Sequence, residues 1–544
     1  MKQFILLLLL LTTSLSAASQ QNTVGLINIK AGVSDGYTLF SPVHSTQTYL
    51  IDNCGRVINE WTSEYPPGSS VYLGEDGNLV RTLKNSNPAY LNPKGPGGGV
   101  EIFSWNGDLI WTFFYNTGDD LQHHDIALIP NGNILLLAWD LKNFEESVAS
   151  GRDPESLPDN EIWSEQVIEV NPNLPAGEQI VWRWNLWDHL VQDFDDSKEN
   201  FGSVQDQPGL VDINYFGDGQ DADWIHANSM DYNSELDQIM IGSRDFNEFW
   251  IIDHSTTTEE ASTHSGGDYG RGGDLLYRWG NPATYKKGDI LDRKLFGQHD
   301  VHWISEGLED EGKVMIFNNG FGRVTEYSSV DILEPQIEDG EYMLVDGVFQ
   351  PTELDWQYQS GKATNFYSFF MSGAQRLQTG GTLICSTAEG KIFEIDSKNE
   401  IVWTYRNPNT ARGILNQGDV PLIGSATYDN YIFRATKYPP LYPAFDGKDL
   451  TPGQTIESGE SSVSCDVTLS YSDNHEIIIY PNPVQDFLSV KGVSSFSIMT
   501  TDGKVVYKHS SRNSELLSIP VSNWTGGMYF LIMNNSEKIK FLKN

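Results

Sequence analysis

The stretch Asp52-Asn-Cys-Gly-Arg-Val-Ile-Asn-Glu-Trp61 decides the fold, because it is a turn followed by a short strand ending on a tryptophan, and it recurs along the chain. Its clearest second copy is Trp105-Asn-Gly-Asp-Leu-Ile-Trp111. Four looser copies end at Trp182, Trp279, Trp356 and Trp403. A second hairpin of alternating apolar residues follows each copy, so the chain contains six repeated units.

Units of short antiparallel strands with Gly turns and a periodic aromatic residue are typical of a β-propeller. We therefore expect an all-β chain in which residues 24–445 form a six-bladed β-propeller. A β-helix or a pair of β-sandwiches are the alternatives, but neither requires one tryptophan per unit. Acidic, Gly-rich insertions at residues 193–223 and 254–274 are expected to surround a binding face.

The composition and the N-terminus limit the partners. The 544 residues include 35 Lys and Arg against 74 Asp and Glu, a formal net charge of -39, which argues against nucleic acid as a partner. An apolar run at residues 4–11 precedes Ser16-Ala-Ala18, so residues 1–18 are predicted to be a secretory signal peptide. The rest of the sequence contains no apolar stretch long enough to predict a transmembrane segment.

The repeat stops after Pro443. Residues 446–474 are rich in Ser, Gly, Asp and Glu and are predicted to be a linker, and residues 475–544 are predicted to form a small β-sandwich domain. Its segments Tyr480-Pro-Asn-Pro483, Asp502-Gly503 and Gly527-Met-Tyr-Phe530 resemble the C-terminal sorting domain of the type IX secretion system of Bacteroidota. The resemblance implies that this machinery exports the protein across the outer membrane, for release or attachment at the cell surface.

Cysteines and acidic loops give little evidence of bridges or cofactors. Cys54, Cys385 and Cys465 lie far apart, so at most one bridge can form within the chain. The loop Asp218-Gly-Gln-Asp-Ala-Asp223 offers oxygen ligands for calcium but lacks the Glu that completes an EF-hand loop, and a solvated acidic loop is the simpler interpretation. No other cofactor is expected.

Histidines gather in the strands that would line the axial channel of a propeller. His123 and His124 lie in one unit, His226 in the next, and His299 and His302 in the third. Because equivalent strands of consecutive blades meet at the axis, we predict a catalytic group of His124, His226, His299 and His302. His299 and His302 are three residues apart, so they point to opposite faces unless a bulge intervenes. The simpler alternative is that these histidines tie neighbouring blades together by hydrogen bonds.

Basic residues beside these strands are notable in so acidic a chain. Arg244, Arg323 and Arg376 each present a fork of donors that suits a sulfate or phosphate group, and we predict that they bind the substrate. Salt bridges to nearby acids are the alternative. The sequence has no HExxH motif and no paired cysteines, so no metal site is predicted.

The central region resembles the bacterial arylsulfate sulfotransferases, which are six-bladed propellers. The matching segments are Asp223-Trp-Ile-His-Ala-Asn-Ser229, Gly242-Ser-Arg244, Gln298-His299 with Trp303-Ile304, and Ile316-Phe-Asn-Asn-Gly-Phe-Gly-Arg323. The resemblance implies that His226, His299 and Arg323 hold a sulfuryl group. It also implies a ping-pong reaction, in which a histidine takes this group from a phenolic sulfate and passes it to an acceptor phenol.

The strand that should carry the family's nucleophile, residues 369–377, contains no histidine. His124 or His302 is therefore the candidate nucleophile, or the fold serves another task. Three functions stay open: a secreted sulfotransferase, a surface propeller that binds an anionic aryl or sugar ligand without turnover, and a hydrolase or lyase that uses the histidines, with or without a metal.

Overall fold

In the computed structural model, the described residues are 21–90, 94–95, 97–219, 221–362, 365–422, 429–465, 478–480, 484–485, 487–491, 495–501, 504–510, 517–533 and 538–543. The predicted signal peptide, residues 1–18, lies outside them. The chain divides into two compact units, Met1–Val467 and Thr468–Asn544.

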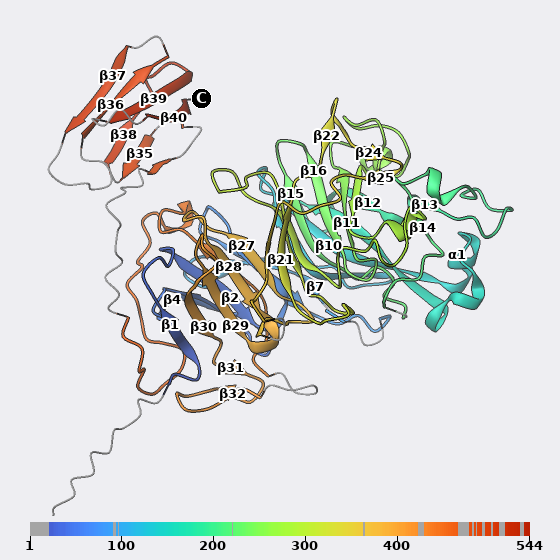
Figure 1. The fold of residues 1–544 in the computed structure, drawn as a ribbon, viewed down its shortest axis with the longest axis horizontal. Helices are drawn as coiled ribbons and strands as arrows, with labels where there is room; N and C mark the ends of the chain where they lie inside the picture. The colour runs from blue at the N-terminus through green and yellow to red at the C-terminus, as the bar shows by residue number, and fades with distance from the viewer. Residues whose placement is uncertain are drawn as a thin grey trace, which may run out of the picture. The chain divides into compact units, whose positions relative to one another are not determined.

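The first unit is a β-propeller, and its described residues form six four-stranded antiparallel blades (Figure 1). Blade 1 contains β33 (Ile432–Tyr438), β2 (Tyr37–Pro42), β3 (Gln47–Ile51) and β4 (Val57–Thr62). Blade 2 contains β5 (Pro67–Leu73), β6 (Leu79–Lys84), β7 (Gly98–Phe103) and β8 (Leu109–Phe114). Blade 3 contains β9 (Asp120–Leu128), β10 (Ile134–Asn143), β11 (Glu161–Val170) and β12 (Ile180–Asn185).

Blades 4 to 6 complete the ring. Blade 4 contains β15 (Ala227–Asn233), β16 (Gln238–Ser243), β17 (Glu248–Asp253) and β18 (Tyr277–Trp279). Blade 5 contains β19 (His299–Trp303), β20 (Val314–Asn318), β21 (Ser329–Leu333) and β26 (Trp356–Tyr358). Blade 6 contains β27 (Gly373–Arg376), β28 (Thr382–Ser386), β29 (Lys391–Ile395) and β30 (Ile401–Arg406). The predicted six-bladed, all-β fold is confirmed.

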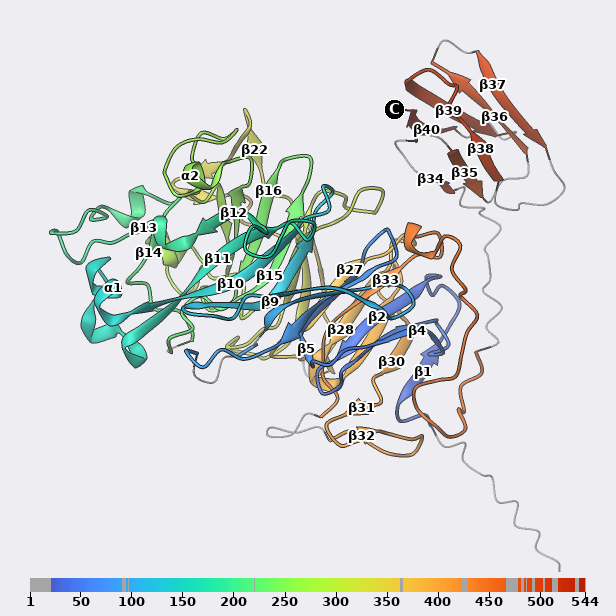
Figure 2. The ribbon, with the colours of Figure 1, turned by 180° about the vertical axis from the view of Figure 1, so that it is seen from behind.

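Two strands from opposite ends of the unit close the ring. The innermost strand of blade 1, β33, pairs antiparallel with β2, although nearly 400 residues separate them. The N-terminal strand β1 (Gly25–Ile29) pairs with β30 as a fifth strand of blade 6. The innermost strands β33, β5, β9, β15, β19 and β27 contact one another in that order and return to β33 (Figure 2).

The repeated tryptophan belongs to the outermost strand of each blade, where it binds the next blade. The indole N–H of Trp61 donates to the carbonyl of Ser104, 2.9 Å away, and that of Trp403 donates to the carbonyl of Asn53, 2.8 Å away. Both acceptors lie in the turn before the outermost strand of the following blade. Because the indole buries a large apolar surface and a satisfied donor together, one tryptophan per blade stabilises the ring.

The insertions carry short elements, and the helices and strands among the described residues are the following. Between β10 and β18 lie α1 (Phe144–Ala149), η1 (Pro154–Ser156), η2 (Pro158–Asn160), η3 (Leu186–Asp188), β13 (Leu190–Val191), η4 (Val204–Asp206), β14 (Val211–Asp212) and α2 (Thr258–Ala261). Later come η5 (Pro282–Tyr285), β22 (Ile337–Glu338), β23 (Glu341–Tyr342), β24 (Leu344–Val345), β25 (Val348–Phe349), η7 (Thr387–Glu389), β31 (Asn409–Thr410), β32 (Gly413–Ile414) and η8 (Pro443–Phe445). None of these helices has the length and apolar character needed to cross a membrane.

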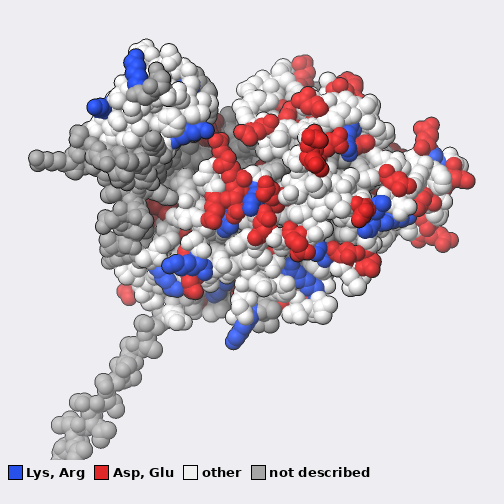
Figure 3. Space-filling view, turned by 45° about the horizontal axis from the view of Figure 1, so that its top comes forward, with Lys and Arg blue, Asp and Glu red and all other residues white. Residues whose placement is uncertain are grey.

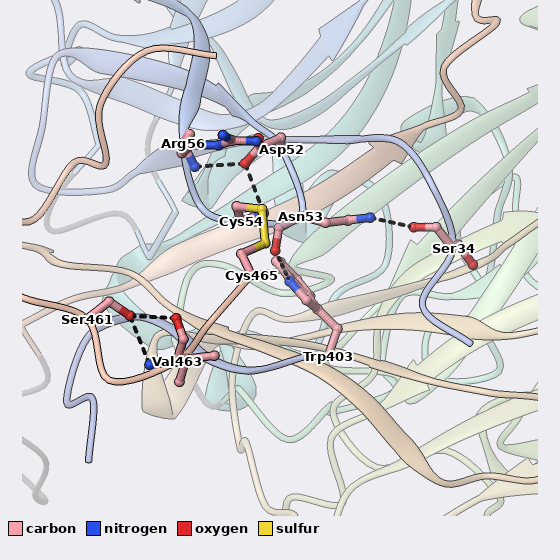
Figure 4. The surroundings of a disulfide bond; sticks show 9 residues. All are labelled: Ser34, Asp52, Asn53, Cys54, Arg56, Trp403, Ser461, Val463 and Cys465. Atoms are coloured by element: carbon pink, nitrogen blue, oxygen red, sulfur yellow. Dashed lines mark hydrogen bonds and ion pairs between the residues drawn. A yellow bond between two sulfur atoms is a disulfide. The ribbon is translucent and has the colours of Figure 1, made fainter. Parts of the chain in front are cut away.

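A disulfide attaches the end of the first unit to blade 1 (Figure 4). Cys54, in the turn between β3 and β4, is bonded to Cys465, with 5.6 Å between their Cα atoms, and the third cysteine, Cys385, is free and buried. We call residues 450–465 the strap; they belong to the segment that was predicted to be a linker. The strap also exchanges backbone hydrogen bonds with Val57. It is therefore packed on the propeller through several contacts.

The second unit consists of two antiparallel sheets. One contains β34 (Ile478–Tyr480), β35 (Phe487–Lys491) and β38 (Leu517–Pro520), and the other contains β37 (Val505–Ser510), β36 (Ser495–Thr500), β39 (Gly527–Met533) and β40 (Lys538–Lys543). Leu488 and Ile519 of the first sheet share one buried core with Ile498 and Leu531 of the second. Residues 481–483 and 502–503 of the sorting motifs lie outside the described residues.

Candidate active site

Irregular backbone at the start of the inner strands aims the histidines at the axis. The register of β9 against β10 shifts across residues 123–125, and β15 and β19 have similar shifts next to His226 and His299. His124 has a φ of 47° and His226 a φ of 50°, a left-handed conformation that is rare for residues other than Gly. Such bulges and strained residues cluster at functional sites because they redirect side chains out of the regular pleat.

The imidazoles of His124 and His226 face each other across blades 3 and 4. Their ring centroids are 4.8 Å apart and the rings are nearly perpendicular. His124 is 3% exposed and His226 is 6% exposed. No described residue forms a hydrogen bond with the Nε2 atom of either ring. Two unpaired ring nitrogens therefore lie at one place close to the axis.

Asp223 orients His226. Its Oδ2 atom lies 2.5 Å from Nδ1 of His226, so Nδ1–H donates to the carboxylate and Nε2 is directed away from it. Burial alone would lower the pKa of His226, but the charge of Asp223 outweighs burial and holds this pKa above its usual range. His226 is therefore the more basic of the two facing imidazoles.

His124 is the end of a buried chain of three groups. Its Nδ1 lies 2.8 Å from Nδ1 of His123, whose Nε2 lies 2.9 Å from Oε2 of Glu165 on β11. The other carboxylate oxygen of Glu165 accepts the backbone N–H of Ala227 at 2.9 Å. His123 stacks on Trp139 with 4.0 Å between ring centroids.

Burial decides the charge of this chain. It lowers the pKa of His124 well below its usual range, helped by the nearby positive groups, and lowers that of His123 to about 3. Burial also raises the pKa of Glu165 well above its usual range. If Glu165 loses its proton, His123 donates Nε2–H to it and accepts Nδ1–H from His124, which leaves a lone pair on Nε2 of His124. The protonation of Glu165 thus sets the tautomer of His124.

His299 is held by hydrogen bonds at both ring nitrogens. Its Nδ1 lies 2.8 Å from Oδ1 of Asn319, and its Nε2 accepts the backbone N–H of Met371 at 3.1 Å. Burial, followed by the charge of Arg244, lowers the pKa of His299 well below its usual range, so the ring is neutral. Met371 belongs to the strand region where the family resemblance implies the nucleophile, and here its backbone binds His299.

Arg244 is the predicted arginine that lies among these histidines. Its charge acts on His124, His226 and His299, and its backbone N–H donates to the carbonyl of His226 at 3.3 Å. One guanidinium nitrogen pairs with Asp245, and the guanidinium lies 5.6 Å from the centre of the Phe321 ring. Its side chain is 19% exposed, so part of it is accessible to an anion.

The other predicted site residues make contacts of a different kind. Arg323 donates to the carbonyl of Tyr327 at 2.9 Å and stacks on its ring. Arg376 pairs with Asp310 at 2.6 Å and lies over a tryptophan ring. His302 directs Nδ1 toward the carbonyl of Asp300, 3.0 Å away, and its side chain is 23% exposed. The bulge in β19 therefore separates His302 from His299, which is buried beside Arg244.

The closing strand brings one further arginine to the axis. Arg434 of β33 lies 2.9 Å from the carboxylate of Asp125 and 2.8 Å from that of Asp300, and its Nη1 donates to the Tyr72 hydroxyl at 2.6 Å. These residues come from blades 1, 2, 3 and 5. Sequence reasoning missed Arg434, Asp125, His123 and Glu165, since only the closed ring brings them together; Asp223 had a local signal, its position three residues before His226.

The acidic loop at residues 218–223 offers no shared ligand set in its described residues. Asp218 pairs with Arg293, Asp221 with Lys94, and Asp223 with His226. A cavity of about 60 Å³ lies behind Asp223 and is lined by Lys94, Glu161 and Trp163 as well as by the loop. Gly95 closes over His124, since a Cβ atom on this glycine would lie 1.9 Å from Nε2.

Acidic side chains dominate the face of the molecule in Figure 3, where red groups outnumber blue ones. The surface of a chain with a net charge of -39 repels anions at long range. An anionic ligand must therefore be held by groups within the site, of which Arg244 is the exposed cation.

The fold and this site define a six-bladed propeller with histidines and an arginine gathered at its axis. The chain belongs to the arylsulfotransferase (ASST) family, whose model matches residues 27–411. Residues 478–544 match the secretion system C-terminal sorting domain, which confirms the predicted sorting domain. The protein is therefore exported to the cell surface or secreted.

No curated protein matches the chain. Among solved structures, a protein of unknown function from Bacteroides caccae aligns over 69% of this chain and 94% of its own, with 11% identity and a TM-score of 0.38. A streptogramin B lyase aligns over 72% of this chain and 84% of its own, with 10% identity and a TM-score of 0.34.

Proposed function

We propose that this protein is a secreted sulfotransferase that moves a sulfuryl group from a phenolic sulfate to an acceptor phenol through His124. The observation that carries the proposal is the pair of ring nitrogens, Nε2 of His124 and Nε2 of His226, which lack a hydrogen bond to any described residue and lie beside Arg244. Membership of the arylsulfotransferase family supports the reaction class.

The two histidines have the different properties that the two roles require. A nucleophilic imidazole must be neutral, and burial keeps His124 neutral. A group that gives a proton to the leaving phenolate and takes one from the acceptor needs a higher pKa, and Asp223 supplies this for His226. Arg244 would stabilise the charge on the sulfuryl oxygens, which is largest in the transition state.

The reaction balances in two steps. In the first, the lone pair of His124 Nε2 forms a bond to sulfur, the bond between sulfur and the aryl oxygen breaks, and the phenolate takes the proton from Nε2 of His226. In the second, the acceptor hydroxyl gives its proton to His226 as its oxygen attacks sulfur, and the bond between nitrogen and sulfur breaks. His299 would position the loop at Met371 rather than react, because both its nitrogens are engaged.

The test is a burst assay on the chain without residues 1–18. The protein is mixed with 4-nitrophenyl sulfate, with and without phenol, and nitrophenolate release is followed together with the mass of the intact protein. We expect a burst with one sulfonate adduct per chain, mapped to His124, and steady turnover only with phenol. A folded chain that gives neither release nor adduct would contradict the proposal for this donor.

A second function is favoured by one observation. Where the family resemblance implies the nucleophile, the backbone of Met371 binds His299 instead. A propeller that keeps Arg244 but binds aryl sulfates without turnover would show this arrangement. Calorimetry with the same donor separates the two, since binding heat without nitrophenolate release supports the binding function.

A further inference from the structure

We propose that His189, His264 and Asp274 bind one divalent cation of the zinc class at the outer edge of blades 3 and 4. His189 follows η3 in the insertion after β12, His264 follows α2, and Asp274 precedes β18. The Oδ1 atom of Asp274 lies 2.8 Å from Nδ1 of His189 and 2.7 Å from Nδ1 of His264. The three ligand atoms lie within 4.8 Å of one another.

The hydrogen bonds of His189 leave a lone pair where the cation would bind. Its Nε2 lies 2.8 Å from the carbonyl oxygen of Ala261, and a carbonyl only accepts, so Nε2 carries the hydrogen. The Nδ1 atom of a neutral ring then faces the Asp274 carboxylate with a lone pair. Two lone pairs at this distance repel unless they share a cation, which is either a proton or a metal ion.

The surroundings of His189 are those of a metal ligand. Metal-binding histidines characteristically donate their second N–H to a carbonyl or carboxylate, which fixes the tautomer and the ring. The ring of His189 also stacks on Trp184, with 5.8 Å between centroids and 4° between planes, and the Trp184 indole donates to the carbonyl of Gly273 at 2.7 Å. A Cβ atom on Gly273 would lie 2.4 Å from Nε2 of His189, so the packing is tight.

The ligand types select the ion. Two imidazoles and one carboxylate suit zinc and its neighbours in the first transition row better than calcium or magnesium, which prefer oxygen. Three protein ligands leave a coordination position for water, and this position is on the solvent side, since the His264 side chain is 60% exposed. The ion would join the insertion that contains α2 to the outer strand of blade 3, independently of the axial histidines.

The experiment uses the metal-free chain without residues 1–18 and without a histidine tag. Zn²⁺ is titrated by calorimetry, and Co²⁺ is titrated by its visible absorption, which reports nitrogen ligands. We expect one strong site per chain, and a loss of affinity of more than about tenfold in His264→Ala and in Asp274→Asn. His264 is exposed, so its replacement leaves the fold intact, and His509→Ala in the second unit is the matched control.

Three outcomes would overturn the proposal. They are an absence of stoichiometric Zn²⁺ uptake, equal affinity in His264→Ala and the control, and a His189 ring that NMR shows to be protonated at both nitrogens in the presence of excess Zn²⁺. In each case a proton rather than a metal joins His189 to Asp274.

Discussion

The Nδ1 atom of His226 lies 2.5 Å from the Oδ2 atom of Asp223, three residues earlier in the chain. This contact directs the other ring nitrogen toward His124 on the neighbouring blade, with 4.8 Å between the ring centroids. A carboxylate that orients an imidazole and raises its pKa prepares it to accept and return a proton. The contact therefore distinguishes His226 from His124, which has no carboxylate on its own Nδ1.

Replacing this carboxylate should move the pH dependence of donor release. In the wild type, the raised pKa of His226 keeps the ring protonated to higher pH, so the burst rate falls only as pH rises through that value. Asp223→Asn removes the charge, the pKa of His226 falls, and the decline should begin at lower pH. Stopped-flow measurement of nitrophenolate release between pH 5 and pH 9 checks this (about the range in which histidine titrates).

Asp218→Asn is the matched control, since Asp218 lies in the same loop but pairs with Arg293. It should leave the alkaline limb unchanged. An identical pH profile in Asp223→Asn and the wild type would remove His226 from the role of proton donor.

Substitution of the two facing histidines should separate their roles. His124→Ala should abolish the sulfonate adduct, because the attacking nitrogen is lost. His226→Ala should still form the adduct but slow its formation by about 10²–10⁴. This loss should be larger with phenyl sulfate than with 4-nitrophenyl sulfate, because the more basic phenolate depends more on a proton donor.

His302→Ala completes this comparison, since the sequence left His302 as the alternative nucleophile. It should keep the adduct, because the bulge in β19 separates His302 from His299 and Arg244. Loss of the adduct in His302→Ala with retention in His124→Ala would reverse the assignment.

Glu165→Gln should inactivate His124 without disturbing its position. The amide oxygen would still accept the N–H of Ala227, and the amide nitrogen would donate to Nε2 of His123. His123 would then donate Nδ1–H to His124, which places the remaining hydrogen of His124 on the attacking nitrogen. We expect the burst rate to fall by at least about a hundredfold at every pH, whereas the wild type gains activity as pH rises through the raised pKa of Glu165.

Glu169→Gln tests whether this effect is specific. Glu169 lies on the same strand and also binds a histidine, His254, at 3.2 Å. Its replacement should leave the burst unchanged. A normal burst in Glu165→Gln, with the His123 and His124 rings in place, would show that the chain of three groups does not control the nucleophile.

The sequence predicts the blades well because the tryptophan that marks each unit has a local role. Trp61 and Trp403 each need a strand of fixed length and an acceptor in the next turn, so the pattern is visible within ten residues. The closure is not visible in this way. Strand β33 reaches β2 only after the ring is complete, and Arg434 arrives at the axis with it.

The candidate site divides along the same line. The inner-strand histidines could be placed near the axis because equivalent strands of a propeller converge there. Their orientations depend on bulges, which no short pattern predicts, and the φ of 47° at His124 is set by the neighbouring strands. Glu165 lies 42 residues from His123 and has no motif, so only the pairing of β11 with β10 brings it beneath the histidines.

The bond between Cys54 and Cys465 should contribute strongly to the stability of the propeller. It closes a loop of 411 residues and holds the strap on blade 1, close to the strands that close the ring. Removing a bridge of this kind typically costs about 2–5 kcal/mol, since the unfolded chain gains freedom. Cys465→Ser should therefore lower the midpoint of denaturation by urea and expose the strap to limited proteolysis.

The double variant Cys54→Ser with Cys465→Ser separates the bridge from the side chains themselves. If the bond carries the effect, the double variant should be no less stable than either single variant, because the second substitution has no bond left to break. Additive losses would instead show that each sulfur is stabilised by its own packing. Cys385 is buried and free in all these variants, so disulfide exchange with it should show up only after unfolding, as a bridge detected by peptide mapping.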